Sequence, residues 1–375
     1  MKKHLTLCLI VLMLLLSSCQ PMPPSQTATV TPAQVIATTS AAPIEPYQDV
    51  RNSDFSTLEG TLDKSLIETL WFNESTKWPE QTRDMAQGIL EQGMNPGLGI
   101  RKLHAQGITG KGVNVAIIDQ NLVSVLDHPE FQGKIVKYFD VGTKQPSDEG
   151  SMHGPAVTSL LVGKNTGTAP GANVYYVAAP SWAADAQYYA DALNWIVDEN
   201  EKQPAGEKIR VVSVSAAPSG PGSPFTINND AWDVAYQRAA KAGILVLDCT
   251  SNHGITAPCY YDLDDPDNVA KCTPGWPGLT NQSMPNRIYI PTSFRTTAEE
   301  YSQGNFSYQY TGRGGLSWSV PYLSGVLALG WQVRPDLTGA QLLDILFKSA
   351  YVTSGGLKII NPAAFIDTVK LAGSQ

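Results

Sequence analysis

The chain has 375 residues, of which 42% are hydrophobic and 16% are charged, so it can bury the core of one large domain with smaller appendages. Its formal net charge is -8 and no basic stripe runs through it, which argues against a nucleic-acid partner. No internal repeat is apparent, and we expect a monomer.

Residues 1–18 have the features of a signal peptide for export. Lys2 and Lys3 precede an apolar stretch at 5–16, and small residues follow it. This stretch is too short for a spanning helix and is typical of a cleaved signal. Its ending, Leu-Ser-Ser-Cys at 16–19, resembles the lipobox of bacterial lipoproteins. That resemblance implies a palmitate-type lipid on Cys19 and a membrane-anchored protein on the extracytoplasmic face of a bacterial cell envelope; ordinary secretion is the alternative.

Two further segments precede the main domain. Residues 19–60 are rich in Pro, Thr, Ser and Ala and lack hydrophobic periodicity, which predicts a flexible tether. Residues 61–96 contain short helical patterns, with Trp71 and Trp78 available to pack against the main body. We expect a short helical appendage there, and one domain over residues 97–375.

From residue 98 onward, strand patterns alternate with helix patterns. The run Val-Asn-Val-Ala-Ile-Ile at 113–118 is typical of a strand buried on both faces. This alternation predicts an α/β fold, a three-layer sandwich with a mostly parallel central sheet flanked by helices. Strands are predicted over 113–118, 173–179, 209–215, 244–248 and 287–291, and helices over 154–163, 182–200, 230–242, from 317 onward and over 337–350.

Four polar residues stand at the ends of predicted strands or the starts of predicted helices. Asp119 ends the first strand, His153 begins a helix, Asn252 follows the strand at 244–248, and Ser317 begins a long apolar helix. Together they offer a hydroxyl nucleophile, an imidazole base, an orienting carboxylate and an amide donor for an oxyanion. Taken alone, Ser317 would be interpreted as a helix cap. The presence of the other three residues favours a catalytic role for Ser317.

These segments resemble the subtilisin-like serine peptidases, the subtilase family, over about residues 97–369. The order Asp, His, Asn, Ser is the family's order. The segment at 315–321 is similar to the family's Gly-Thr-Ser-Met-Ala-x-Pro element. Further similar elements are Gly-Lys-Gly-Val at 110–113, His-Pro-Glu-Phe at 128–131, His-Gly at 153–154, Ala-Pro-Gly-Ala at 169–172 and Pro-Asp-Leu-Thr at 335–338.

The resemblance implies a serine endopeptidase that hydrolyses polypeptide substrates through an acyl-enzyme intermediate and requires no cofactor. In it, Ser317 would be the nucleophile, His153 the general base and then acid, and Asp119 the group that orients His153. Asn252 and the Ser317 backbone N–H would form the oxyanion hole. The substrate-binding strand segment would comprise Ser215, Ala216 and Ala217.

Departures from the family pattern leave two alternatives open. Gln120 and Asn121 replace small residues after the aspartate, Pro155 replaces a threonine, and Leu316 and Trp318 flank the serine. Crowding by these residues would suit a catalytically impaired subtilase-like binding or scaffolding lipoprotein. An esterase with the same triad is the second alternative, but the Gly-x-Ser-x-Gly element is absent around the serine.

The remaining cysteines and acidic residues favour structural roles. Cys259 and Cys272 bracket a loop-like segment and are the expected disulfide, which leaves Cys249 as a buried free thiol. No cysteine pair has the tight spacing of a zinc site, so we expect no metal. An acidic segment lacks the EF-hand pattern, so a solvated loop is favoured over the alternative of a structural calcium site; its carboxylates are Asp262, Asp264, Asp265 and Asp267.

Two residues near Asn252 remain. Asp248, at a strand end, is expected to be buried and hydrogen-bonded, with a partner that the sequence does not identify. His253 is expected to lie on a surface loop, with substrate contact as the less favoured alternative.

Overall fold

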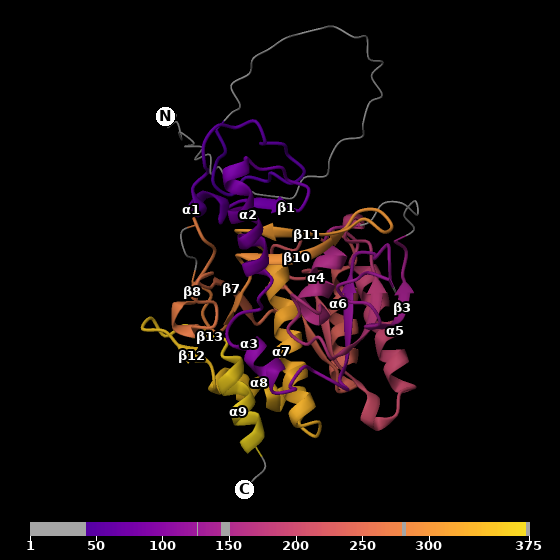
Figure 1. Ribbon diagram of the computed structural model, residues 1–375. Coiled ribbons are helices and arrows are strands. Elements are labelled where there is room, and N and C mark those ends of the chain that lie inside the picture. The colour runs from indigo at the N-terminus through magenta and orange to yellow at the C-terminus, as the bar shows by residue number, and fades with distance from the viewer. Residues whose placement is uncertain (1–42, 126, 144–150, 280–282, 373–375) are drawn as a thin grey trace, which may run out of the picture. The chain divides into compact units, whose positions relative to one another are not determined.

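A five-stranded parallel sheet with the strand order β3-β4-β2-β5-β6 is the main sheet of the domain; its edge strand β3 is labelled at the right of Figure 1. Its strands are β2 (Asn114–Asp119), β3 (Ile135–Asp140), β4 (Asn173–Ala178), β5 (Ile209–Val214) and β6 (Leu245–Leu247). The central strand β2 pairs with β4 and β5, and all six of its residues are buried. Burial on both faces explains why this strand is a nearly continuous run of apolar residues.

The computed structural model describes residues 43–375 except 126, 144–150, 280–282 and 373–375. The predicted signal peptide, Cys19 and the first part of the predicted tether lie outside the described residues. Residues 43–375 belong to one unit in which the N-terminal part contacts the rest. No helix in the described ranges has the length and apolar character needed to cross a lipid bilayer.

Alternate side chains of β2 enter two separate cores. Val115 and Ile117 pack with α4 (His153–Val162) and α7 (Ser319–Val333), whereas Ala116 and Ile118 pack with α5 (Ala186–Glu201) and α6 (Asn229–Lys241). Helices on both faces of a parallel sheet make the three-layer sandwich that the sequence predicts. The helices are α3 (Ile100–Ala105), α4 (His153–Val162), α5 (Ala186–Glu201), α6 (Asn229–Lys241), α7 (Ser319–Val333), α8 (Gly339–Lys348) and α9 (Pro362–Leu371).

A second sheet has the strand order β12-β13-β9-β7-β8. It shares a hydrophobic core with α4 and α7. The predicted strand at 287–291 belongs to this sheet rather than to the central one. Its strands are β7 (Thr256–Tyr260), β8 (Thr273–Pro274), β9 (Ile288–Pro291), β12 (Tyr351–Val352) and β13 (Lys358–Ile359). Single 3-10 turns occur at η1 (Ser181–Ala183), η2 (Ala205–Glu207), η3 (Val269–Lys271) and η4 (Leu316–Trp318).

The N-terminal segment shares a sheet with the body of the domain. Strand β1 (Trp71–Asn73) pairs antiparallel with β11 (Phe306–Thr311), which pairs with β10 (Arg295–Glu300). Figure 1 shows this indigo segment, with α1 (Lys64–Ile67) and α2 (Glu80–Gly93), against the orange β10–β11 hairpin. The predicted helical appendage over 61–96 is thus partly helical, but its strand was not predicted. Trp71 contacts the body as expected, because its Nε1 donates to Gln309 Oε1 at 2.9 Å.

The prediction of a flexible tether is wrong for residues 43–60. The Val50 N–H donates to the Trp71 carbonyl and the Phe55 N–H to the Lys77 carbonyl, both at 2.8 Å. Val50 is 1% exposed. Polar composition suggested a linker, but a few apolar side chains and backbone bonds to a neighbouring strand order this segment.

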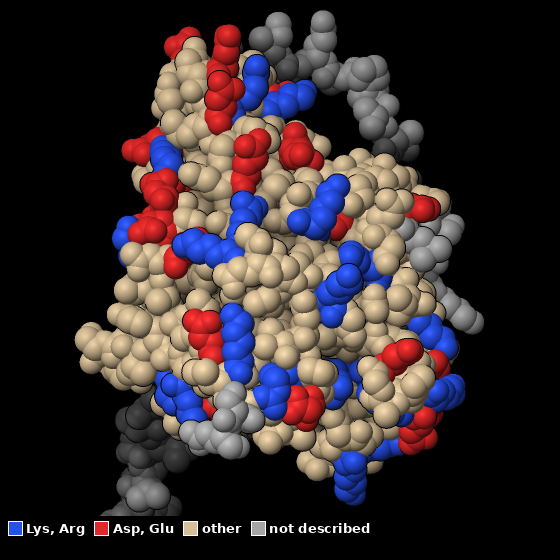
Figure 2. Space-filling view, turned by 60° about the horizontal axis from the view of Figure 1, so that its bottom comes forward, with Lys and Arg blue, Asp and Glu red and all other residues tan. Residues whose placement is uncertain are grey.

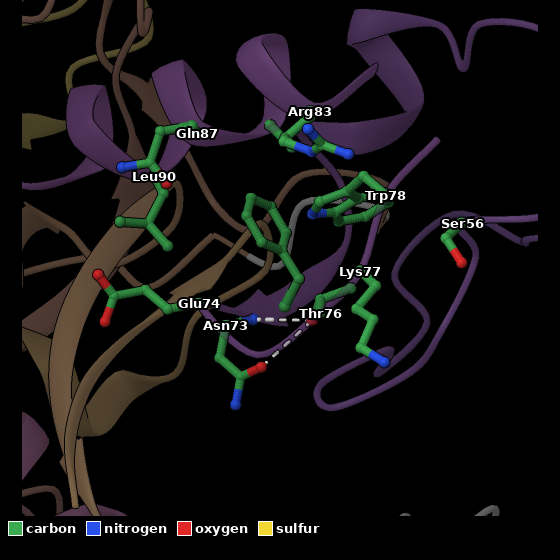
Figure 3. A pocket seen from close by; sticks show the side chains of 11 residues that line it. Ser56, Asn73, Glu74, Thr76, Lys77, Trp78, Arg83, Gln87 and Leu90 are labelled. Atoms are coloured by element: carbon green, nitrogen blue, oxygen red, sulfur yellow. Dashed lines mark hydrogen bonds between the residues drawn. The ribbon is translucent and has the colours of Figure 1, made fainter. Parts of the chain in front are cut away.

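A pocket of about 350 Å³ opens between β1 and α2 (Figure 3). Phe72, Trp78 and Leu90 are among its apolar lining residues. Lys77 and Arg83 also line it, and both are labelled in Figure 3. The predicted catalytic residues do not line it. On the face shown in Figure 2, acidic and basic side chains are interspersed over the described residues.

Candidate active site

Asp119 and His153 lie together at the carboxyl end of the central sheet. Asp119 is the last residue of β2 and is 1% exposed, and His153 is the first residue of α4. The His153 Nδ1 lies 2.6 Å from Asp119 Oδ1, and the Gln120 N–H donates to the same oxygen at 2.8 Å. A buried carboxylate thereby fixes the orientation of the imidazole ring.

Burial of His153 by itself lowers the pKa of the imidazole. The charge of Asp119 and its hydrogen bond raise that pKa by more, so the net shift is upward from 6.5. A raised pKa marks an imidazole whose protonated form is stabilised, as a base that must hold a proton during acyl transfer requires.

Ser317 lies in the 3-10 turn η4, directly before α7. Its Oγ donates to the Ser215 carbonyl at 3.2 Å, and the Ser215 Oγ donates to the Ser317 carbonyl at 2.8 Å. Ser215 follows β5, the neighbour of β2. These two hydrogen bonds connect the turn that contains Ser317 to the carboxyl end of the central sheet, where Asp119 also lies.

The Ser317 hydroxyl and the His153 ring are not hydrogen-bonded to each other in the part of the chain that the structure describes. Trp318, the residue after Ser317, contacts the imidazole, and its ring centroid lies 5.5 Å from that of His153. The serine side chain has one rotatable carbon–carbon bond, so its hydroxyl can exchange the Ser215 carbonyl for another acceptor without backbone movement. Catalytic hydrogen bonds are often long or misaligned without substrate.

Asn252 is exposed in the turn that follows β6. Its side chain lies beside Gly220, where an added Cβ would come within 3.1 Å of its Nδ2. Among the described residues, no hydrogen bond joins Asn252 to Ser317. The predicted amide donor is therefore exposed and available, without a contact to the nucleophile.

The predicted substrate-binding segment continues from β5 toward the turn that carries Asn252. The Ala216 carbonyl accepts from the Cys249 N–H at 2.9 Å, and the Ala217 carbonyl accepts from Ser223 Oγ at 2.7 Å. Ala216 and Ala217 are both half-buried. The first of these bonds extends the pairing of β5 and β6 beyond the sheet.

Gln120 and Ser151 are site residues that sequence reasoning did not identify. Gln120 Nε2 donates to Ser181 Oγ at 2.5 Å, and its Oε1 accepts from Ser151 Oγ. The Ser151 Oγ in turn accepts from the His153 N–H at 3.0 Å. The departure at Gln120 therefore links the start of α4 to the loop after β4. The only sequence signal was that Gln120 follows Asp119, because its partners lie far along the chain.

The cysteines pair as the sequence suggested. Cys259 and Cys272 form a disulfide with a Cα–Cα distance of 6.3 Å, and Cys249 is a free thiol. Cys249 is half-buried as a residue, rather than fully buried as expected. Burial raises the pKa of its thiol, and the charge of Asp248 raises it further, so this group is a poor nucleophile at neutral pH.

The carboxylates of the acidic segment form ion pairs with lysines. Asp262 and Asp265 pair with Lys271 at 3.1 and 2.9 Å. Asp264 and Asp267 pair with Lys64 and Lys102, respectively, each at 3.0 Å. Within the described ranges, no group of three or more potential ligand side chains is placed to hold a metal ion.

Asp248 and His253 lie together, which corrects one expectation. Asp248 is buried and hydrogen-bonded as predicted, with Trp232 Nε1 at 3.0 Å and Thr250 Oγ1 at 2.7 Å as donors. The surface position expected for His253 is wrong, because its side chain is only 18% exposed and stacks on Tyr236. The sequence did not show that helix α6 covers this turn.

Comparisons with known proteins agree with this geometry. The model of the subtilase family matches residues 110–288. Subtilisin E of Bacillus subtilis (strain 168) is 25% identical over 316 residues, which cover 77% of this chain and 74% of that protein.

Solved structures share the fold. Fervidolysin from Fervidobacterium pennivorans, a keratinolytic enzyme related to subtilisin, has a TM-score of 0.54 at 15% identity, with 73% of this chain and 45% of that chain covered. The prenylagaramide maturation protease PagA has a TM-score of 0.51 at 17% identity, with 72% and 98% covered. The family match and the subtilisin relatives support a subtilisin-like serine endopeptidase, and the solved structures share its fold.

Proposed function

We propose that Asp119, His153 and Ser317 are the catalytic triad of this endopeptidase, with Asn252 and the Ser317 N–H as its oxyanion hole. The observation that carries the proposal is the 2.6 Å contact between His153 Nδ1 and the buried Asp119 carboxylate. This contact lies at the carboxyl end of the central sheet, where Ser317 is hydrogen-bonded to Ser215. Nucleophile, base and orienting acid thereby come from three separate elements that meet at one edge.

In the proposed reaction the substrate strand extends along Ser215 to Ala217 through main-chain bonds. The Ser317 hydroxyl turns from the Ser215 carbonyl, gives its proton to His153 and attacks the scissile carbonyl carbon. Asp119 stabilises the imidazolium that forms, and Asn252 donates to the new oxyanion. His153 then protonates the leaving amine, and water, deprotonated by the same imidazole, hydrolyses the acyl-enzyme.

Labelling by a fluorophosphonate probe tests the nucleophile. We expect the chain from residue 20 onward to be labelled once, and Ser317→Ala to abolish the label. Ser324→Ala is the matched control, because Ser324 lies in α7, the helix that follows Ser317, and among the described residues its Oγ bonds only to the Val320 carbonyl, at 2.9 Å. Labelling that persists in Ser317→Ala would refute the assignment. A folded wild-type protein that takes no label would favour the catalytically impaired binding or scaffolding lipoprotein.

We also propose that the enzyme works outside the cytoplasm, anchored through a lipid on Cys19. The lipobox-like ending of the N-terminal apolar stretch supports this proposal. In a bacterial host fed an alkynyl fatty acid, the wild-type protein should carry the label and sediment with membranes. Cys19→Ala should lose the label, and Cys8→Ala, a change within the apolar stretch, should keep it. An unlabelled wild-type protein in the culture medium would indicate ordinary secretion.

A further inference from the structure

The turn that carries Asn252 begins at a fully buried carboxylate that the triad does not use. Asp248 follows β6, and its side chain is 0% exposed. Its Oδ1 accepts from the Thr250 N–H at 3.0 Å and from the Thr250 Oγ1 at 2.7 Å, and its Oδ2 accepts from Trp232 Nε1 at 3.0 Å. A buried carboxylate needs such donors, because desolvation otherwise disfavours its charge.

The same carboxylate also lies against His253, at the other end of the turn. The His253 Nδ1 is buried without a hydrogen bond and lies 3.4 Å from Asp248 Oδ2, an ion-pair distance. Its Nε2 lies 3.8 Å from Asp233 Oδ1, and its ring stacks on Tyr236 with centroids 4.0 Å apart. Asp233 and Tyr236 belong to α6, so this helix and the strand end enclose the imidazole from two sides.

These contacts restrict the conformation of Ser251 and Asn252, the two residues between Thr250 and His253. The His253 N–H donates to Thr250 Oγ1 at 2.9 Å, which closes the turn around Ser251 and Asn252. Arg287 adds contacts to the Thr250 and Ser251 carbonyls at 3.4 and 3.5 Å. A donor held in place before the reaction lowers the barrier more than one that must be ordered during it.

We infer that His253, held by Asp248, is a positioning residue that fixes the turn and thereby aims the Asn252 amide at the oxyanion. In this inference His253 acts through Asn252 rather than on the substrate or the reacting atoms. The inference rests on the proposed role of Asn252. It predicts that loss of His253 lowers kcat rather than raising KM, and only while Asn252 is present.

A double-mutant cycle on the chain from residue 20 onward tests this, with hydrolysis of a library-selected peptide p-nitroanilide as the assay. His253→Phe keeps a ring for Tyr236 but loses both nitrogens, and we expect kcat to fall about tenfold to a hundredfold with KM little changed. Asn252→Ala should lose about two to three orders of magnitude in kcat. The double variant should be no slower than Asn252→Ala alone.

Two further variants act as controls. His104→Phe should leave kcat unchanged, because that imidazole lies in α3 and bonds to the Thr168 carbonyl at 2.8 Å. Asp248→Asn keeps the shape of the carboxyl group and should reproduce the kcat loss if His253→Phe fails to fold.

Two results would overturn the inference in distinguishable ways. Losses that multiply in the double variant, or no loss in His253→Phe while Asn252→Ala is impaired, would refute the positioning role alone. A wild-type kcat in Asn252→Ala would instead refute the proposed oxyanion donor, and with it the premise of the inference.

Discussion

At the scale of single residues, some of the residues around His153 could be predicted from the local sequence pattern and others could not. Asp119 and His153 were predicted because each stands at the end of a clear strand or helix. Gln120 and Ser151 were not, because the hydrogen bond between them joins residues 31 positions apart in the chain. The departures from the family pattern that suggested crowding include at least one residue that ties the site together.

The raised pKa of His153 predicts a specific pH dependence. His153 accepts a proton only when it is neutral, so kcat/KM should increase as pH rises through a pKa above 6.5. The ion pair with Asp119 stabilises the fold fully below pH 6.5, and this contribution should be lost as pH rises through the folded-state pKa. Asp119→Asn should move the acidic limb of the profile to lower pH and cut kcat by about 10⁴.

The measurements are kcat/KM and the thermal unfolding midpoint between pH 5 and pH 9. An acidic limb that does not move in Asp119→Asn would contradict the assignment of His153 as the base. The Asn side chain keeps the size of the carboxylate, so a shift of the limb reports charge rather than packing.

At the scale of elements, prediction succeeded for strands with a continuous apolar run and missed strands with interrupted or polar patterns, namely β3, β7 and β10 among others. Every residue of β10 is buried although the strand includes Arg295, Glu299 and Glu300. Its carboxylates are tolerated because distant donors reach them: Asn73 Nδ2 bonds to Glu299 at 2.8 Å, and Ser124 Oγ bonds to Glu300 at 2.6 Å. Periodicity cannot reveal burial that depends on such partners.

The disulfide between Cys259 and Cys272 predicts a measurable contribution to stability. The two residues are 13 apart in sequence, and closing a loop of this size contributes about 3 kcal/mol by the chain-entropy estimate. Cys259→Ser with Cys272→Ser should therefore lower the free energy of unfolding in urea by roughly that amount. Reductant should lower the stability of the wild type and of Cys249→Ala alike. Equal unfolding midpoints with and without reductant would show that the bond does not form.

At the scale of the whole molecule, the N-terminal segment is part of the domain. Thr296 Oγ1 donates to the Leu90 carbonyl at 2.6 Å, and Gly93 packs so closely against Thr296 that an added Cβ would come within 2.6 Å of its Oγ1. Phe72 and Ile89 share a core cluster with Tyr310 of β11. Strand β1 also covers the edge of β11, which would otherwise be open to other chains.

We therefore predict that the mature enzyme keeps residues 43–96. Each buried side chain of the size of Phe72, Trp78 or Leu90 contributes about 1.5–3 kcal/mol, against a typical total stability of about 5–15 kcal/mol. A chain that begins at Gly97 should thus unfold or aggregate, and mass spectrometry of the cell-associated wild type should find peptides from 43–96. An active wild-type enzyme with its N-terminus near Gly97 would refute this.

The sequence by itself determined the layered α/β architecture, the central strand and the positions of Asp119, His153, Asn252 and Ser317. Each of these depends on apolar periodicity or on a residue's place at an element end, and both are local properties of the chain. Only the tertiary structure decided that residues 43–60 are ordered and that β1 joins β11. It also decided that Asp248 and His253 lie against each other at the turn of Asn252. Those features depend on contacts between distant segments, whose strength follows distance in space and burial rather than position in the sequence.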